Sequence, residues 1–339
     1  MKRPPIRYLY ETLHPDLYHG QHVKRPFFEG WYFKLVDAAR VNVWAVIPGI
    51  YRDFDPALDH AFVMLLNGRS QHVAFVRYPA EDFAAARDKF LIRVGPNFFG
   101  ADFLTLNLPQ AHGHLSFSGT TPWPVTWTAP GIMGWYAWFP MECYHGVVSM
   151  DHALFGRLTC ADEVIDFDGG RGYIEKDWGR NFPQTWIWLQ ANHFDTPEVS
   201  LTASIARIPF YGRVFPGFII GLELDGRLYR FATYLGATLD KVIVDGTGNV
   251  MNRVEIVVTN KQYRLQINAE RGATALLYAP TPGQGMVPRV KESITATVRV
   301  HLSDSQGAVL FAGESSFAGM EIEGDTRILQ IGPLHQSVP

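Results

Sequence analysis

Four short segments of the chain place ionisable or amide side chains beside large aromatic rings. In the first, a strand over residues 27–36 puts Glu29 on one face with Trp31 and Phe33, because side chains alternate along a strand with a period of two. If that face points inward, the loss of solvent raises the pKa of the carboxyl, and Glu29 holds a proton near neutral pH. Alternatively, Glu29 is an ordinary carboxylate at the end of its strand, paired with an arginine or bound to backbone amides.

The second segment, residues 172–179, places Glu175 and Asp177 on one face of an extended chain, beside Trp178. Two carboxyl groups held close together can share one proton, which raises the pKa of one of them. Lys176 lies between them in the sequence, so a plain network of ion pairs is an equally good interpretation. The segment is therefore either a second candidate acid or a structural cluster of charges.

The third segment, residues 185–194, alternates between an apolar face and a face that carries two indoles and two amides. The mixed face consists of Trp186, Trp188, Gln190 and Asn192. Apolar walls with a few orienting polar groups are typical of a ligand pocket. In the alternative interpretation, the backbone satisfies both amides and the face binds nothing. We favour a pocket.

The fourth segment, residues 141–152, places His145 on one face with Cys143, and Tyr144 on the other. His145 could act as a general base for a hydroxyl. The chain has twelve histidines but neither a His-Glu-x-x-His motif nor paired cysteines, so we predict no metal site. It also lacks a P-loop, a dinucleotide-binding fingerprint and a Gly-x-Ser-x-Gly elbow, so we predict no cofactor.

Charge and cysteine content narrow the class of protein further. The 339 residues carry 30 Lys and Arg against 33 Asp and Glu, a net charge of −3, so we expect no nucleic-acid partner. Two cysteines are too few for a disulfide scaffold, and neither an apolar leader nor a membrane-spanning stretch is visible. We therefore predict a cytoplasmic protein, with peripheral contact to a membrane as a route for collecting an apolar ligand.

The aromatic residues are distributed unevenly. All nine tryptophans lie at or before Trp188. From Phe103 to Met141 the chain has no Asp, Glu, Lys or Arg, yet five prolines interrupt it. Prolines at this density exclude a membrane helix, and we expect loops and short strands around an apolar space. Because aromatic rings supply large apolar contact surfaces, this distribution indicates a pocket for an apolar ligand.

The elements that must position these residues are almost all strands. Apolar runs flank the turn dipeptides Asn67-Gly68 and Asp225-Gly226, a pattern typical of β-hairpins. Only the alanine-rich residues 80–90 have a pattern that favours a helix.

A weak internal repeat indicates two domains. The segment around Trp31 is similar to the segment around Trp186, and a turn dipeptide follows each of them. Alternatively, two short aromatic strands match here by coincidence. We therefore predict a duplicated β unit, with an N-terminal domain over residues 1–168 and a C-terminal domain over residues 169–339.

Three motifs together resemble the tocopherol cyclase family: Phe-Glu-Gly-Trp-Tyr-Phe-Lys at 28–34, Tyr-Ile-Glu-Lys-Asp-Trp-Gly at 173–179, and Phe-Pro-Gln-Thr-Trp-Ile-Trp-Leu-Gln-Ala-Asn at 182–192. That family belongs with the double lipocalin-like (calycin) proteins, which include carotenoid hydratases. The resemblance implies an all-β fold of two consecutive antiparallel lipocalin-like barrels or sandwiches, with very few short helices, around an apolar cavity. Plant cyclases have Asn at the position of Asp177, so the resemblance favours Glu29 or Glu175 as the acid.

The resemblance also implies a reaction that needs no metal or redox cofactor. An acid protonates the first double bond in the tail of a prenylated hydroquinone, and the phenol oxygen captures the cation to close a chromanol ring. The candidate catalytic residues are then Glu29, Glu175, Asp177 and His145. The candidate substrate-binding residues are aromatic or carry an amide: Trp31, Tyr32, Tyr144, Trp178, Trp186, Trp188, Gln190 and Asn192. Two alternatives stay open: a terpenoid hydratase that uses the same acid, and a protein that only binds or carries a lipophile.

Overall fold

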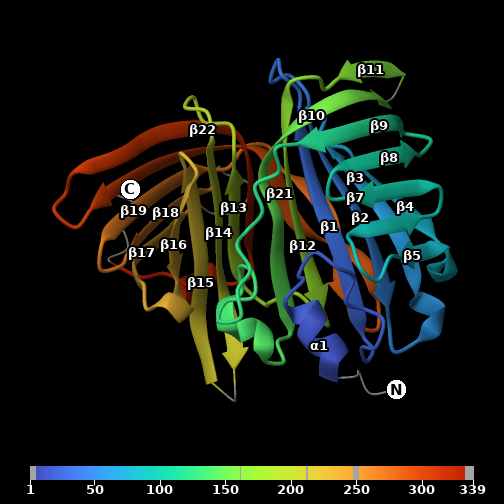
Figure 1. Ribbon diagram of the computed structural model, residues 1–339, viewed down its shortest axis with the longest axis horizontal. Helices are drawn as coiled ribbons and strands as arrows, with labels where there is room; N and C mark the ends of the chain where they lie inside the picture. The colour runs from blue at the N-terminus through green and yellow to red at the C-terminus, as the bar shows by residue number, and fades with distance from the viewer. Residues whose placement is uncertain (1–4, 161, 211–212, 247–251, 333–339) are drawn as a thin grey trace. The chain divides into compact units, whose positions relative to one another are not determined.

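The computed structural model describes residues 5–160, 162–210, 213–246 and 252–332, and strands make up most of them (Figure 1). The one α-helix in these ranges is α1 (Pro5–Thr12). Short 3-10 turns make up the other helical segments: η1 (Pro56–Leu58), η2 (Ala80–Asp82), η3 (Gly134–Trp138), η4 (Thr233–Leu235) and η5 (Thr326–Ile328). The prediction of an all-β chain with very few short helices is therefore confirmed. No helix within the described ranges is long and apolar enough to cross a membrane.

The first sheet has 12 strands in the order β4-β3-β2-β1-β12-β10-β9-β8-β7-β6-β5, with β11 paired to β10. Its strands are β1 (Phe27–Val36), β2 (Val43–Arg52), β3 (His60–Asn67), β4 (Val73–Tyr78), β5 (Phe83–Ala85), β6 (Leu91–Val94), β7 (Asn97–Gly100), β8 (Phe103–Asn107), β9 (Ala111–Ser118), β10 (Cys143–Cys160), β11 (Glu163–Asp166) and β12 (Gly170–Gly179). The order brings the first and last strands of this sheet, β1 and β12, next to each other.

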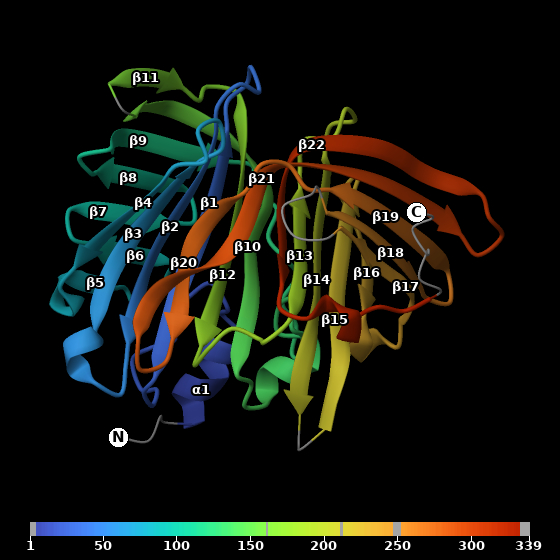
Figure 2. The same ribbon diagram turned by 180° about the vertical axis from the view of Figure 1, so that it is seen from behind.

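The second sheet has 10 strands in the order β16-β15-β14-β13-β22-β21-β19-β18-β17, with β20 paired to β21. Its strands are β13 (Trp186–Ala191), β14 (Val199–Phe210), β15 (Arg213–Leu224), β16 (Arg227–Ala232), β17 (Thr238–Asp245), β18 (Arg253–Thr259), β19 (Tyr263–Glu270), β20 (Ala275–Thr281), β21 (Gly285–Asp304) and β22 (Val309–Glu323). Figure 2 shows these strands from behind.

Both sheets have the same arrangement around their first strand. In the first sheet, β1 pairs with β2 on one side and with β12 on the other. In the second sheet, β13 pairs with β14 on one side and with the last strand, β22, on the other. Trp31 lies on β1 and Trp186 on β13, so the repeat expected around these two tryptophans falls on equivalent strands.

Two compact units make up the chain. The first contains the residues up to Phe182 together with Ala275–Val290, and the second contains Pro183–Thr274 and the residues from Lys291 onward. The chain therefore leaves the first unit after β12, later than the predicted division between residues 168 and 169. The reason is that β12 pairs with β1 and β10 and so completes the first sheet.

β20 returns to the first unit from far along the chain. The ring of Tyr278 stacks on Phe75 of β4, with ring centroids 4.2 Å apart and an interplanar angle of 7°. The backbone N–H of Gly283 donates to the Asp53 carboxylate at 2.8 Å. A stacked ring pair and a charge-assisted hydrogen bond thus fix the β20–β21 turn to the first unit.

The helix expected over residues 80–90 is wrong. Ala80–Asp82 form one 3-10 turn, and Phe83–Ala85 then form β5, which pairs with β6. Backbone pairing with a neighbouring strand outweighs the weak helical propensity of a short alanine-rich segment. By contrast, the uncharged segment from Phe103 to Met141 does consist of two short strands followed by a loop with η3, as expected.

Each unit has its own apolar core. In the first unit, Trp31, Phe33 and Leu35 of β1 are fully buried, as expected for the inward face of that strand. The opposite face of β1 is also buried, with Tyr32 only 9% exposed. β1 is therefore a central strand covered on both sides, and its polar residues must find partners inside the protein.

Candidate active site

Three neighbouring strands of the first sheet hold most of the candidate residues. β12 lies between β1 and β10, and its register places Trp178 opposite Glu29 on one side and opposite Tyr144 on the other. The same register places Asp177 opposite His145. Antiparallel pairing therefore brings together segments that are far apart in the sequence.

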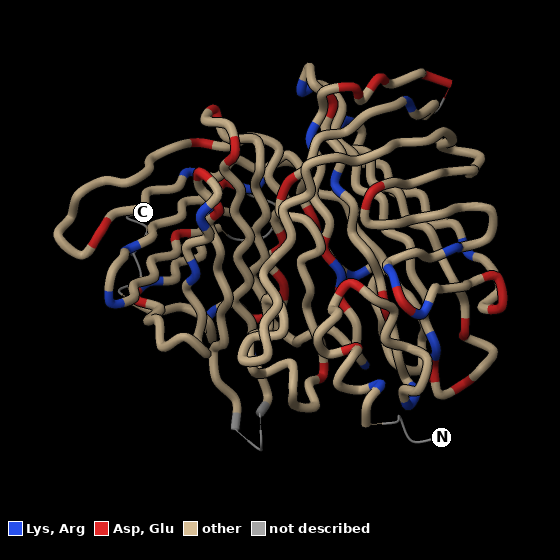
Figure 3. The backbone as a smooth tube through the Cα atoms, in the orientation of Figure 1, with Lys and Arg blue, Asp and Glu red and all other residues tan. Residues whose placement is uncertain are grey.

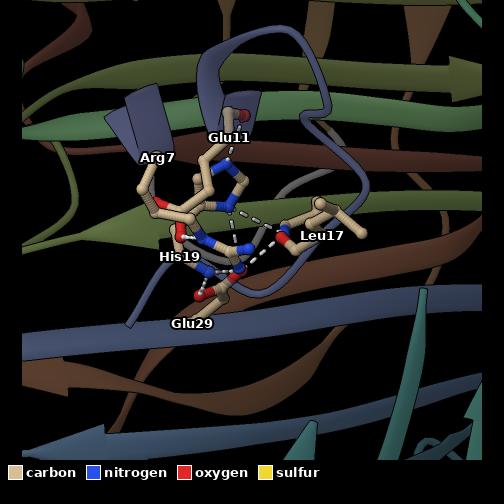
Figure 4. Close-up of polar contacts among 6 residues, drawn as sticks. Arg7, Glu11, Leu17, His19 and Glu29 are labelled. Carbon is tan, nitrogen blue, oxygen red and sulfur yellow. Dashed lines mark hydrogen bonds and ion pairs between the residues drawn. The ribbon is translucent and has the colours of Figure 1, made fainter. Parts of the chain in front are cut away.

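Glu29 lies in a buried cluster with His19 (Figure 4) and with Lys176. The Lys176 ammonium donates to the Glu29 carboxylate and to the carbonyl oxygen of Leu17. The backbone N–H of His19 donates to the other carboxylate oxygen of Glu29 at 2.8 Å. The His19 ring lies 3.3 Å from Glu29, and its Nε2 lies 3.1 Å from the carbonyl oxygen of Glu11. Glu29 and Lys176 have no exposed surface, so each needs the other as a counter-ion.

The expected rise in the pKa of Glu29 is wrong. Burial alone raises the pKa of this carboxyl, but the charge of Lys176 and the hydrogen bonds from His19 hold it below its ordinary value. The strand pattern predicted the burial correctly, but it gave no sign of the ammonium group that comes from β12. Glu29 is therefore an ionised partner of Lys176 and carries no proton near neutral pH.

A second cluster places His145 between two carboxylates. Its Nδ1 lies 2.9 Å from Asp177, and its Nε2 lies 3.6 Å from Glu175. The hydroxyl of Tyr173 donates to Glu175 at 2.5 Å. Burial lowers the pKa of His145, but the charges of Glu175 and Asp177 outweigh it and raise the pKa to about 9. The imidazole is thus an imidazolium near neutral pH, so His145 can act as the expected general base for a hydroxyl only after it has given up a proton.

The contacts of His145 favour an ion-pair cluster over a metal centre. Donor atoms of His145, Glu175 and Asp177 all lie within 4.8 Å of one another, close enough in principle to share an ion. However, the two carboxylates face different ring nitrogens. A metal ion takes only one ring nitrogen and needs its ligands to converge on one point. A proton on each nitrogen suits this arrangement better.

A cavity of about 600 Å³ opens beside these clusters in the first unit. Its walls are mostly apolar or aromatic, with a few polar groups: Tyr8, Thr12, Pro15, His19, Val23, Lys24, Phe27, Pro130, Met133, Ala137, Pro140, Met141, Glu142, Tyr144, His145, Trp178, Gly179 and Arg180. The volume is within the range of pockets that bury a drug-sized ligand. Both His145 and His19 reach it.

Trp178 is the central aromatic residue of the cavity wall. Its indole stacks with the His19 ring at 4.3 Å and with the Tyr144 ring at 5.4 Å, and the interplanar angles are 10° and 7°. The Lys176 ammonium lies 4.7 Å from the centre of the same indole. The Tyr144 hydroxyl donates to the carbonyl oxygen of Phe139, which fixes that ring. The wall is thus a rigid stack of rings with a cation held against it.

The other aromatic candidates are not part of this wall. Trp31 is fully buried in the core, where it stacks with Phe90 and also contacts the Lys176 ammonium at 4.7 Å. Tyr32 is buried on the opposite face of β1 and is not among the residues that line the cavity.

The mixed face of β13 belongs to the second unit. Trp186, Trp188, Gln190 and Asn192 are all buried, and every residue that lines the cavity belongs to the first unit. The Trp186 indole donates to Glu321 at 2.7 Å. The structure therefore does not bring these four residues to the cavity described here, and their role in binding stays a prediction.

Sequence reasoning missed several polar residues of the cavity. His19 comes from the irregular segment between α1 and β1, where no strand period could place it. Glu142 lies within the segment analysed around His145, and burial raises its pKa against the opposing charge of Arg180. Lys24 and Arg180 lie in loops at the ends of strands, so neither follows an alternating pattern.

Comparison with known proteins agrees with the family resemblance seen in the sequence. The model of the tocopherol cyclase-like family matches residues 108–324. A probable chloroplastic tocopherol cyclase of Oryza sativa subsp. japonica is 24% identical, over 91% of this chain and 77% of that protein. The chloroplastic tocopherol cyclase of Zea mays is 23% identical, with the same coverage. Those names refer to the chloroplast, so the cytoplasmic location expected for this chain stays a prediction.

A solved structure supports the same fold. The crystal structure of CghA matches with a TM-score of 0.58 at 11% identity, over 92% of this chain and 91% of that one. The structure of CghA with Sch210972 gives a TM-score of 0.56 at 12% identity, over 90% of each chain. At this identity the similarity concerns the fold alone, and it agrees with the lipocalin-like architecture expected from the sequence. Because the family model matches more than half of its residues, this chain belongs to the tocopherol cyclase-like family.

Proposed function

We propose that this chain is a cyclase that closes a chromanol ring on a prenylated hydroquinone, with His145 as the proton donor. The observation that carries the proposal is an imidazolium, with its pKa raised to about 9, in the wall of an apolar and aromatic cavity. Family membership supports the reaction class. The cavity volume of about 600 Å³ suits a ligand with one ring and a folded prenyl tail.

The Nε2–H of His145 is the proton that reacts. Nδ1 is held by Asp177 at 2.9 Å, whereas Nε2 is buried and makes no hydrogen bond within the described ranges. A buried donor without an acceptor is unfavourable, so a substrate π-bond or phenol oxygen in the cavity is a suitable partner. Glu175 lies at 3.6 Å, close enough to stabilise the charge but beyond hydrogen-bond distance.

The reaction is a balanced isomerisation. The Nε2 proton passes to the less substituted carbon of the first tail double bond, and the π electrons form the new C–H bond. The phenol oxygen then forms a bond to the tertiary carbon and loses its proton to the now neutral His145, which restores the imidazolium. The rings of Trp178 and Tyr144 stabilise the positive charge that develops on the tail.

Glu29, Lys176 and His19 act as positioning residues in this scheme. The ion pair of Glu29 and Lys176 is sealed from solvent, and it fixes both the backbone of His19 and the cation beneath the Trp178 indole. Preorganised groups need little rearrangement when charge develops in the substrate.

A product assay on a panel of prenylated benzoquinols tests the proposal. Cyclisation leaves the mass unchanged and changes the chromatographic retention, whereas hydration adds one water to the mass and simple binding yields no product. We expect His145→Gln to lose turnover while tryptophan fluorescence still reports ligand binding. His112→Gln, an exposed histidine on β9, is the matched control and should keep wild-type turnover. Unchanged turnover in His145→Gln would rule out His145 as the donor.

A further inference from the structure

An exposed apolar rim lies beside the cavity in the first unit. We define the rim as Ile6, Leu9, Val23, Val125, Trp127 and Trp135, all of which are exposed. Ile6 is 83% exposed and Trp127 is 67% exposed. Scattered single apolar residues are normal on a protein surface, but these six lie on segments that also line one cavity.

Helix α1 turns its apolar side chains outward. Its ionic pair, Arg7 and Glu11, is directed inward: the Arg7 Nε donates to Glu11 at 2.5 Å, and Glu11 is 1% exposed. Ile6 and Leu9 remain at the surface. A surface helix in water normally has the opposite arrangement, with its charges outside and its apolar stripe toward the core. The outer side of α1 therefore suits an apolar environment.

The loop between β9 and β10 supplies the aromatic part of the rim. The rings of Trp127 and Trp138 stack at 6.1 Å, and the Trp138 indole donates to the carbonyl oxygen of Trp127 at 3.0 Å. The Tyr8 hydroxyl of α1 donates to the carbonyl oxygen of Trp138 at 2.7 Å, which ties the helix to this loop. Figures 1 and 2 both show α1 next to η3 of the loop. The parts of the rim on α1 and on the loop are therefore held together.

The charge distribution favours a lipid surface over a protein partner. No Asp, Glu, Lys or Arg occurs from Phe103 to Met141, so the tube in Figure 3 is tan throughout the loop. Tryptophan and tyrosine at the boundary between apolar and polar regions are typical of membrane interfaces. Lys24 and Arg180 are exposed in the cavity wall, opposite in charge to lipid phosphate groups, and Glu142 is the one carboxylate among the lining residues.

We propose that the apolar rim docks onto a phospholipid bilayer, so that the cavity opens toward the membrane and takes its apolar substrate directly from the lipid. The same segments form the rim and the cavity entrance: α1 contributes Tyr8 and Thr12 to the wall, and the loop contributes Pro130 and Met133. The second half of the proposal rests on the proposed function, whereas docking itself does not.

Flotation with vesicles that contain no substrate tests the docking. Vesicles of phosphatidylcholine with phosphatidylglycerol should carry the wild-type protein to the top of a density gradient. Trp127→Asp and Ile6→Asp should each weaken this binding by about tenfold or more, because each replaces a large apolar contact with a charge. Val164→Asp is the control, since Val164 is 63% exposed and lies on β11, at the end of the first unit away from α1 (Figure 1).

Several outcomes would overturn the proposal. The proposal is contradicted if the wild-type protein stays in the dense fraction. It is also contradicted if Trp127→Asp and Val164→Asp float equally well. A wild-type dimer that Trp127→Asp converts to a monomer, without any change in flotation, assigns the rim to a second copy instead. Thermal unfolding checks that Trp127→Asp is folded.

Turnover separates this proposal from the proposed function. We expect Trp127→Asp to keep turnover on substrate dissolved in detergent and to lose it on substrate held in vesicles. If the proposed function is wrong, the wild-type protein should show no turnover in either preparation, while its flotation stays the same.

Discussion

Replacing Asp177 by Asn removes one of the two negative charges that hold the His145 imidazolium. The amide oxygen of Asn can still accept the Nδ1–H hydrogen bond, so the ring keeps its orientation. An opposite charge within about 4–6 Å shifts a pKa by about 1–3 units, so loss of the Asp177 charge should lower the pKa of His145 by that amount even though the hydrogen bond is kept. The Asp177 side chain is 31% exposed, so solvent screening favours the lower value.

The sign of the effect on activity follows from the role of His145. An acid is active only while it holds its proton, so kcat/KM should fall as the pH rises through the pKa of His145, which is about 9 in the wild-type protein. In Asp177→Asn the same fall should begin about one pH unit lower. At a pH well below both pKa values, both proteins should be active, because His145 is protonated in each.

The assay is the pH dependence of kcat/KM for chromanol formation from about pH 6 to about pH 10. Asp166→Asn is a matched control. Asp166 also forms an ion pair with a basic side chain, that of Arg157, but it lies exposed on β11. The control should have the wild-type profile. Alkaline limbs that coincide in the wild-type protein and Asp177→Asn would refute the assignment of His145 as the acid.

The remaining predictions concern stability. Lys176→Met leaves the buried Glu29 carboxylate without its counter-ion and should lower the free energy of unfolding by about 3–5 kcal/mol in urea titrations; a loss below about 1 kcal/mol would contradict a sealed ion pair. Gly319→Ala adds a Cβ that would lie 2.6 Å from the Trp188 ring, and it should destabilise the protein by about 1–3 kcal/mol. Gly30→Ala is its control, because the nearest atom to that Cβ is 3.9 Å away. Equal effects of the two alanines would show that the contact with Trp188 is unimportant.

Local sequence patterns predicted the strands and their buried faces, but not the partners of the charged groups. The period of two placed Glu29 inside correctly, because that inference needs only neighbouring residues. The direction in which its pKa shifts depends on Lys176, which lies 147 residues away in the sequence. The pairing of β1 with β12 brings Lys176 to Glu29. No local pattern contains that information.

The same limit applies to the second cluster and to the cavity. His145 and Asp177 were both candidates, but only the register of β10 against β12 turns them into an ion pair. His19 was missed because an irregular segment positions it. The two indoles and two amides of β13 did form a buried face, yet that strand belongs to the second unit rather than to the one that contains the cavity.

The return of β20 means that the two units are interleaved along the chain. The second unit begins at Pro183, before the first is finished at Val290. During synthesis, the first unit must therefore wait for strands β13 to β19 to leave the ribosome before Tyr278 can cover Phe75 and Gly283 can bind Asp53. A fragment that ends at Phe182 lacks these contacts. Cleavage of the chain at one site cannot separate either unit intact from the other. The two units can therefore be expected to fold completely only as parts of one chain.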